Sequence, residues 1–473
     1  MYKLSLFYNN LHTKSYSSTL IRRFSRTPNK NSKLCGWPKS DYGPVDVHRS
    51  SFLNGLKVAA VKPMGAQICC CTVMFSVGSR CEADDELGVS HFLRTASSLT
   101  GCSSSGFIRS RLIQEKGAYL SVNSDRQTVC YTLRCPYYLF NELKCYLLDC
   151  GPRNFYLQHE LDEIMPCVHE DLYRISPEQR VMDLIQKACF TGGLSNSVYC
   201  EESRIYDMTT DTIDAFVNKY FQPMTCTIGS YGVPFEEILK MASMVDSGKS
   251  NRPKSCKCPQ RSNFRSGFES YDLGIGAPTY VAIAVPSCGT CDFSTLLAYS
   301  ILAHSCGAGN SLTPGCQDLT PQTPLSLLGD GDPHTEFKAF NISYMECGIF
   351  GILIKSPSET IRCAAFRAAE FLFNLRCIDC NTIEIGRRRL KVGLNISEYD
   401  CMAYSEGLAL QIANDIVLDS AKDFSNELDR VSVERVRYLA NAVSYNACNM
   451  GVAVVGDVGK APHDGELRRS PQF

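Results

Sequence analysis

Hydrophobic and polar residues alternate in two separate places along this chain, each time around a short turn. One stretch covers residues 118–136 (AYLSVNSDRQTVCYTLRCP) and the other residues 338–357 (KAFNISYMECGIFGILIKSP). Alternation places every second side chain on the same face of an extended backbone, so each stretch predicts a β-hairpin. Apolar residues at helical spacing follow both hairpins, at 137–150 and 361–377, and predict two amphipathic helices.

The hairpins belong to a longer repeat. Four signals occur twice in the same order: a strand pair leading into a helix, a hairpin with its helix, a charged helical stretch, and a closing helix–strand unit. Val77 then corresponds to Val285, and Asp207 to Asp429. In each closing unit a Thr or Ser follows this Asp by two or three residues and is expected to cap the next helix. The pattern therefore predicts an internal duplication.

The duplication predicts an α+β fold with two homologous tandem domains, each a mixed sheet with helices packed on one face. The N-terminal domain is expected at residues 45–245 and the C-terminal domain at 267–460, followed by a tail at 461–473. Residues 246–266 are rich in Ser, Lys, Arg and Pro and have no apolar period. They predict an exposed linker.

The first forty residues differ in composition from the rest. They contain basic residues and serines but no acid; the first acid is Asp41. This composition is typical of a mitochondrial transit peptide, and its charge suits import along an inside-negative potential. Residues 1–40 are therefore predicted to be a transit peptide with a disordered start, and a disordered basic tail is the alternative. The stretch RRFSR predicts cleavage between Phe24 and Ser25, with Arg22 at the third position before the cut.

Composition narrows the class of protein. Hydrophobic residues make up 44% and charged residues 21%, as in ordinary soluble globular proteins. The formal net charge of −1 argues against a broad nucleic-acid surface. No apolar run approaches the ~20 residues of a membrane helix, so a role at a membrane would be peripheral. The 26 cysteines lie in apolar runs such as ICCCTVMF, which favours small buried side chains in a reducing compartment over a disulfide framework.

Motifs for common catalytic or metal sites are weak. Two Cys-x-x-Cys pairs, at 288–291 and 377–380, fall in different predicted elements, which disfavours a zinc ribbon. His304 is a lone histidine in an apolar helix and is expected to pack in the core. The glycine-containing stretch at 307–311 lacks the Gly-Lys-Ser/Thr end of a phosphate loop.

The stretch GSRCEADDELGVSHFLRTASSLTG, at residues 78–101, and the two tandem domains behind a basic leader resemble the inverted-zincin metallopeptidase family. The resemblance covers about residues 46–459. The family includes both subunits of the mitochondrial processing peptidase and the two core proteins of ubiquinol–cytochrome c reductase. The form SHFLRTASSLT resembles the core proteins most.

The catalytic motif of that family is H-x-x-E-H on a helix, in which two histidines bind zinc and the glutamate accepts a proton from the bound water. Here the five positions from His91 read HFLRT. Arg94 replaces the general base and cannot be deprotonated, and Thr95 replaces the second histidine. A third ligand would fall near His169 and Glu170. We therefore predict no catalytic residues, no cofactor and no metal site, and a protein that is not an enzyme.

The resemblance implies a noncatalytic structural subunit of the respiratory reductase, on the matrix side of the mitochondrial inner membrane. The implied partners are core protein one and the cytochrome b, cytochrome c1 and iron–sulfur subunits, in a dimeric complex. Attachment to the membrane would be peripheral, through those partners, and the redox cofactors would belong to them.

The alternative within the family is the noncatalytic, presequence-binding alpha subunit of the processing peptidase. That subunit carries a long glycine-rich loop in its second domain. The corresponding region here, residues 304–328, contains three glycines and three prolines. Because proline stiffens a loop that glycine would leave free, this region favours the core proteins.

Overall fold

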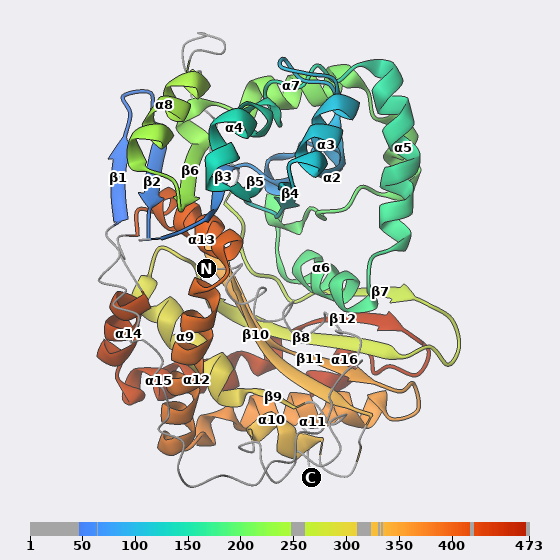
Figure 1. Cartoon of the computed structure of the whole chain (residues 1–473). Coiled ribbons are helices and arrows are strands. Elements are labelled where there is room, and N and C mark those ends of the chain that lie inside the picture. Colours follow the sequence, from blue (N-terminus) through green and yellow to red (C-terminus); the bar gives the residue numbers. More distant parts are fainter. Residues whose placement is uncertain are drawn as a thin grey trace, which may run out of the picture.

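The computed structural model describes residues 47–63, 65–246, 261–309, 323–329, 332, 334–416 and 421–469. The predicted transit peptide, with its cleavage residues Arg22, Phe24 and Ser25, lies outside the described residues, as does most of the predicted linker. Strands within the described part form two sheets, one in each half of the chain (Figure 1).

The first sheet has the strand order β1-β2-β6-β3-β5-β4. β2 and β6 are parallel, and the other neighbouring strands are antiparallel. The first predicted hairpin is the pair β4–β5. The strands are β1 (Val47–Ser51), β2 (Lys57–Val61), β3 (Ile68–Phe75), β4 (Tyr119–Ser124), β5 (Val129–Pro136) and β6 (Cys226–Tyr231).

The second sheet has the order β7-β12-β8-β11-β10-β9. Without the edge strands β1 and β9, the two sheets match strand for strand, and β7–β12 repeats the parallel pair β2–β6. The predicted α+β class and the duplication are confirmed. The strands are β7 (Phe268–Asp272), β8 (Thr279–Cys288), β9 (Ala308–Gly309), β10 (Glu336–Ser343), β11 (Cys347–Ser356) and β12 (Gly451–Gly456).

Helices cover one face of each sheet and enclose the main hydrophobic core of each half. The predicted caps are confirmed: the Thr209 side chain accepts the backbone N–H of Thr212, and Ser432 that of Arg435. In the first half the helices are α2 (Val89–Thr95), α3 (Gly106–Glu115), α4 (Phe140–Asp149), α5 (Gln158–Tyr173), α6 (Pro177–Cys189), α7 (Thr210–Tyr220) and α8 (Phe235–Asp246). In the second half they are α9 (Phe293–Cys306), α10 (Pro324–Leu328), α11 (Ile361–Asn374), α12 (Cys380–Glu398), α13 (Cys401–Ala413), α14 (Ala421–Arg430), α15 (Val433–Asn446) and α16 (Asp464–Leu467).

The opposite face of each sheet is covered by a helix from the other half of the chain. α6 packs on β8 and β12 of the second sheet, where Ile185 joins a cluster with Ala284. α13 packs on β2, β3 and β6 of the first sheet, where Leu408 joins a cluster with Ala59. Figure 1 shows this exchange: green α6 lies beside β7 and β12, and orange α13 lies beside the first sheet. α6 and α13 therefore hold the two halves together. The domain boundaries predicted from the sequence stay a prediction.

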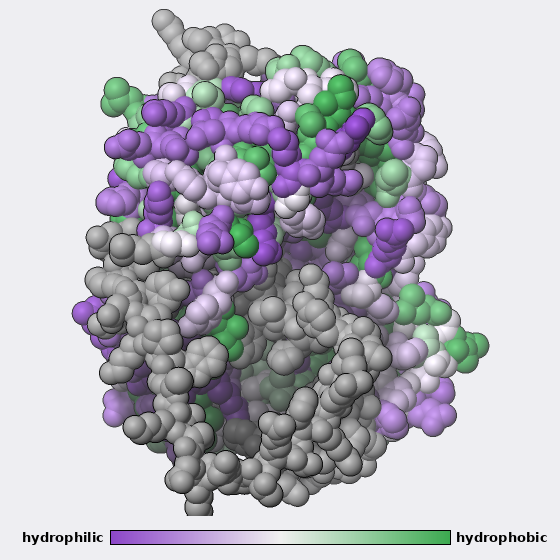
Figure 2. Space-filling view, in the orientation of Figure 1, coloured by the Kyte–Doolittle hydropathy of each residue, from purple (hydrophilic) through white to green (hydrophobic). Residues whose placement is uncertain are grey.

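The outer surface over the first half is mostly hydrophilic in the view of Figure 2, with hydrophobic residues gathered over α3. Phe107 and Ile108, in the first turn of α3, are exposed. Among the described residues, no helix is both long enough and apolar enough to cross a membrane.

Candidate functional site

The positions compared above with the H-x-x-E-H motif, from His91 to Thr95, lie on α2, which is fixed tightly against the first core. α2 begins after Gly88, whose φ of 97° lies in the left-handed region that favours glycine. The Glu82 carboxylate accepts the backbone N–H groups of Gly88 (2.9 Å) and Ser90 (2.7 Å) at the start of the helix. Burial raises the pKa of Glu82 to about 7, against these hydrogen bonds, which lower it.

His91 is fully buried, and both of its ring nitrogens are engaged. The backbone N–H of Cys200 donates to Nδ1 (3.2 Å), and Nε2 lies 3.0 Å from Oδ2 of Asp171. Because an amide N–H can only donate, Nδ1 carries no proton, and Nε2–H donates to the carboxylate. Burial lowers the pKa of His91, while the bond to Asp171 opposes the shift. The ring is therefore a neutral imidazole with a defined tautomer.

Arg94 completes the cluster. Its guanidinium forms an ion pair with the same Oδ2 of Asp171, and its Cζ lies 5.5 Å from the centre of the Tyr199 ring. The same tyrosine packs edge-on against His91, with the ring centres 5.8 Å apart. The hydrogen bond from His91 lowers the pKa of Asp171 to about 2, and the charge of Arg94 acts in the same direction. A permanent cation thus neutralises the carboxylate at the end of α2.

The third ligand position differs from the sequence-based expectation. Glu170 is turned away from α2 and pairs with Arg174 one turn along α5, on the exposed surface. The next residue, Asp171, is the one that faces His91. Thr95 donates its hydroxyl to the backbone oxygen of His91 (3.2 Å), as helical Thr residues often do. Neighbouring acids on α5 cannot be distinguished from the sequence alone, because the rotation of that helix against α2 is a tertiary property.

These residues do not fit a catalytic zinc ion. The donor set is one imidazole and one carboxylate, and the guanidinium of Arg94 lies on the carboxylate where a dication would have to bind. Binding zinc through Nε2 of His91 would move the proton to Nδ1, where it would face the Cys200 N–H. Elsewhere in the described part of the chain, no three His, Cys, Asp or Glu side chains are grouped so that they could hold a metal.

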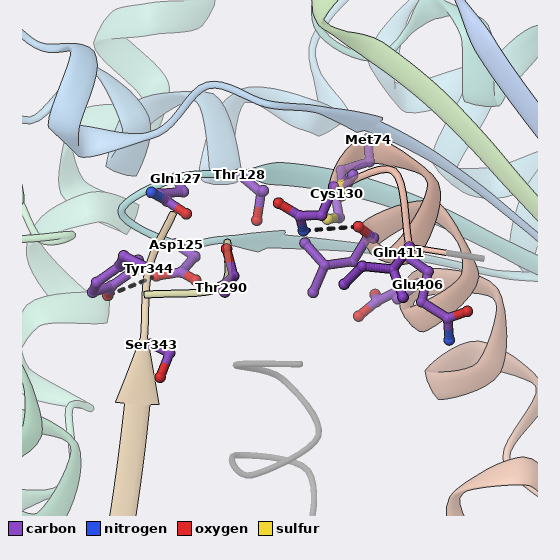
Figure 3. Close-up of a pocket in the computed structure, with 13 residues that line it drawn as sticks. Met74, Asp125, Gln127, Thr128, Cys130, Thr290, Ser343, Tyr344, Glu406 and Gln411 are labelled. Atoms are coloured by element: carbon purple, nitrogen blue, oxygen red, sulfur yellow. Dashed lines mark hydrogen bonds between the residues drawn. The ribbon is translucent and has the colours of Figure 1, made fainter. Parts of the chain in front are cut away.

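A second candidate site is a pocket at the interface between the two halves of the chain, which we call the seam (Figure 3). It lies between the β4–β5 turn, the end of β10 and α13, and none of its lining residues belongs to α2 or α5. Tyr344 points toward Asp125, with its hydroxyl donating to Oδ1 at 3.4 Å. The pocket is lined by Met74, Asp125, Gln127, Thr128, Cys130, Thr290, Ser343, Tyr344, Glu406, Leu410, Gln411, Asn414 and Ile416.

The carboxylates of this pocket take part in holding the halves together. Glu406 of α13 is buried, and its Oε1 accepts from the Thr132 hydroxyl and the Asn123 amide, both at 2.9 Å. Both donors belong to the first sheet, so Glu406 fixes α13 to it. No histidine or lysine is among the lining residues. Among its carboxylates, Glu406 is engaged in fixing α13 to the first sheet, and the lining has no histidine to serve as the base of a Ser–His or Cys–His pair.

Comparison with known proteins shows what this sequence is similar to. The family model of Insulinase (Peptidase family M16) matches residues 57–202, which include the α2 site. Human mitochondrial cytochrome b-c1 complex subunit 2 is 24% identical over 433 residues, which cover 90% of this chain and 92% of the human protein. The chain resembles cytochrome b-c1 complex subunit 2 over nine-tenths of its length. The sequence-based resemblance to the core proteins within the inverted zincins is thereby confirmed, and these relatives are of the core-2 type.

Relatives from the processing-peptidase branch also match. The potato mitochondrial-processing peptidase subunit alpha is 22% identical over 448 residues, covering 90% of this chain and 85% of the potato protein. The Neurospora crassa subunit beta is 23% identical over 451 residues, covering 89% of this chain and 90% of the relative. Identity alone separates these branches little, so residues at the site must distinguish them.

Proposed function

We propose that this chain is the core-2-type subunit of a mitochondrial cytochrome b-c1 complex, and that it acts there as a structural protein without chemistry of its own. The near full-length similarity to subunit 2 supports the first part. The second part rests on one observation: the Arg94 guanidinium is paired with Asp171 at the position where the family's zinc would bind. A fixed cation there stabilises the fold and repels a metal ion.

The proposed place of the subunit is the matrix side of the inner membrane, in a dimeric complex. Core protein one would be its direct partner, and the cytochrome b, cytochrome c1 and iron–sulfur subunits would carry the redox groups. The lack of a membrane-spanning helix among the described residues is compatible with attachment through those partners. The subunit would contribute contact surfaces for its partners rather than a reaction. This role would explain why both domains are retained.

The second candidate is the alpha subunit of the mitochondrial processing peptidase, supported by the potato relative. A presequence-binding role would use the loop after α9, and residues 310–322 of that region lie outside the described residues. The prolines of this region favour the core-protein role.

Affinity capture of the tagged chain from detergent-solubilised mitochondria distinguishes the two candidates. The core-2 role predicts that cytochrome b, cytochrome c1 and a homologous core protein elute with the chain in equal amounts. Capture of an active zinc peptidase subunit without cytochromes would overturn the proposal. An untagged strain processed in parallel controls for unspecific binding.

A further inference from the structure

Two cysteines meet where α13 crosses the first sheet. Along β3, Cys69 and Cys71 face the main core of the first half. Strand alternation turns Cys70 to the opposite face, which α13 covers. Cys401 is the first residue of α13, and the Cys70 thiol donates to its Sγ at 2.7 Å. These two thiols, 331 residues apart in the chain, join the two halves.

The surroundings of Cys401 favour its thiolate. The residue stands at a helix N-terminus, where the backbone dipole stabilises negative charge. Arg134 of β5 is paired in register with Cys70, so its side chain lies on the same face of the sheet. The hydrogen bond from Cys70 lowers the pKa of Cys401, Arg134 adds to this, and burial opposes it. For Cys71, in the core, burial raises the pKa.

Access to solvent is asymmetric within the pair. Cys401 is partly exposed, and Cys70 is buried behind it. A small oxidant therefore reaches Cys401 first, and Cys70 is already in contact to respond. This combination of an accessible thiolate and an adjacent second thiol is that of redox-responsive pairs.

We propose that Cys70 and Cys401 are a modification site, at which a hydroperoxide converts the two thiols into a reversible disulfide between β3 and α13. The Cys401 thiolate attacks the terminal oxygen of the peroxide, forms a sulfenic acid and releases the other oxygen as hydroxide from hydrogen peroxide, or as an alkoxide from an organic hydroperoxide. The Cys70 thiol then attacks the sulfenic sulfur, the S–S bond forms, and the displaced oxygen leaves as water. The two sulfurs together lose two electrons, and the O–O bond of the peroxide receives both. A dithiol reductant reverses the link by exchange.

Formation of the disulfide requires little movement, and it would join β3 to α13 covalently. The sulfurs need to approach from 2.7 Å to about 2.05 Å. α13 already contacts the sheet through the hydroxyls of Thr72 and Ser405, 2.9 Å apart. A link that closes so long a loop restricts the unfolded chain, and we expect it to raise the thermal midpoint by several degrees. The contact between Cys70 and Cys401 lies within this chain. The proposal therefore does not depend on which complex the chain joins.

The test uses the full chain in its native assembly. Mitochondria are treated with hydrogen peroxide, free thiols are blocked with N-ethylmaleimide, and peptides are identified by mass spectrometry. We expect a peptide pair linked through Cys70 and Cys401 that disappears on dithiothreitol treatment. The matched control pair is Cys69 and Cys135, which also lie close, with Sγ atoms 3.5 Å apart, but are both buried; it should stay reduced.

Two outcomes would overturn the proposal. One is absence of the Cys70–Cys401 link at peroxide doses that oxidise the exposed Cys102. The other is equal linking of the buried control pair, which would show that proximity alone decides. In Cys401→Ser, the linked peptide and the peroxide-dependent rise of the thermal midpoint should both be lost.

Discussion

Replacing Gly229 of β6 by alanine should separate α13 from the first sheet. An added Cβ would lie 2.4 Å from the backbone oxygen of Ser405 and 2.8 Å from the backbone nitrogen of Ala409. Both atoms belong to the helix backbone, so no side-chain rotation relieves the overlap. Widening the 2.4 Å approach to an ordinary contact near 3.4 Å requires α13 to move outward by about 1 Å.

That movement would weaken the polar bonds that fix α13. The Thr72–Ser405 bond and the bond from Thr132 to Glu406 are both 2.9 Å long and buried. Overpacking of a core costs about 1–3 kcal/mol, and a buried polar group that loses its partner costs about 1–3 kcal/mol more. We expect Gly229→Ala to lower the free energy of unfolding by about 3 kcal/mol.

Pulse proteolysis in urea, with immunodetection of this chain in solubilised mitochondria, measures the change without isolating the subunit. The matched control is Gly407→Ala on α13 itself, where an added Cβ meets nothing within 4 Å. Alanine is favoured over glycine in a helix by about 1 kcal/mol, so the control should unfold at the same or higher urea. An unchanged urea midpoint for Gly229→Ala would refute the close packing of α13 on β6.

Three further predictions concern buried charge, pH and zinc. Arg126→Met removes the guanidinium that donates to the buried Asp183 carboxylate at 2.6 Å, and should lower the unfolding free energy by about 3–5 kcal/mol; an unchanged urea midpoint would contradict this. Because burial lowers the pKa of His91, the unfolded chain binds more protons at this residue below the ordinary pKa of 6.5, so the contribution of His91 to stability falls as pH drops through that value. Relative to the wild type, His91→Gln should therefore lose less urea midpoint between about pH 7.5 and about pH 5.5, and an equal change in both proteins would exclude the histidine as a source. Elemental analysis should find no stoichiometric zinc in the wild type or in the double variant Arg94→Glu with Thr95→His, since the Cys200 N–H holds the wrong imidazole tautomer; one zinc per chain in the double variant would refute that reason.

Most of the fold could be predicted from the internal repeat in the sequence. Alternation at the two hairpins and the Thr209 and Ser432 caps are local signals, so their elements formed where expected. The exchange of α6 and α13 was not foreseen. An amphipathic helix shows which of its faces is apolar, but not which of two similar sheets it covers, because that choice depends on chain connections and on close approaches such as Gly229.

The site was predictable only in part. The replacements at Arg94 and Thr95 can be seen in the sequence, because the spacing of the motif lies within one helix. The pairing of Arg94 with Asp171 could not be seen in the sequence, because the two residues are 77 positions apart and lie on different helices. The thiol contact between Cys70 and Cys401 was missed for the same reason: among 26 cysteines, only tertiary packing selects a pair.

The most direct test of the structural role is depletion of this chain, with the assembled cytochrome b-c1 complex quantified on native gels and its ubiquinol–cytochrome c activity measured. We expect assembled complex and activity to fall together, and to recover on re-expression of either the wild-type chain or His91→Ala, with the same turnover per assembled complex. Normal amounts of complex after depletion would contradict the account. So would a His91→Ala complex that assembles normally but does not turn over.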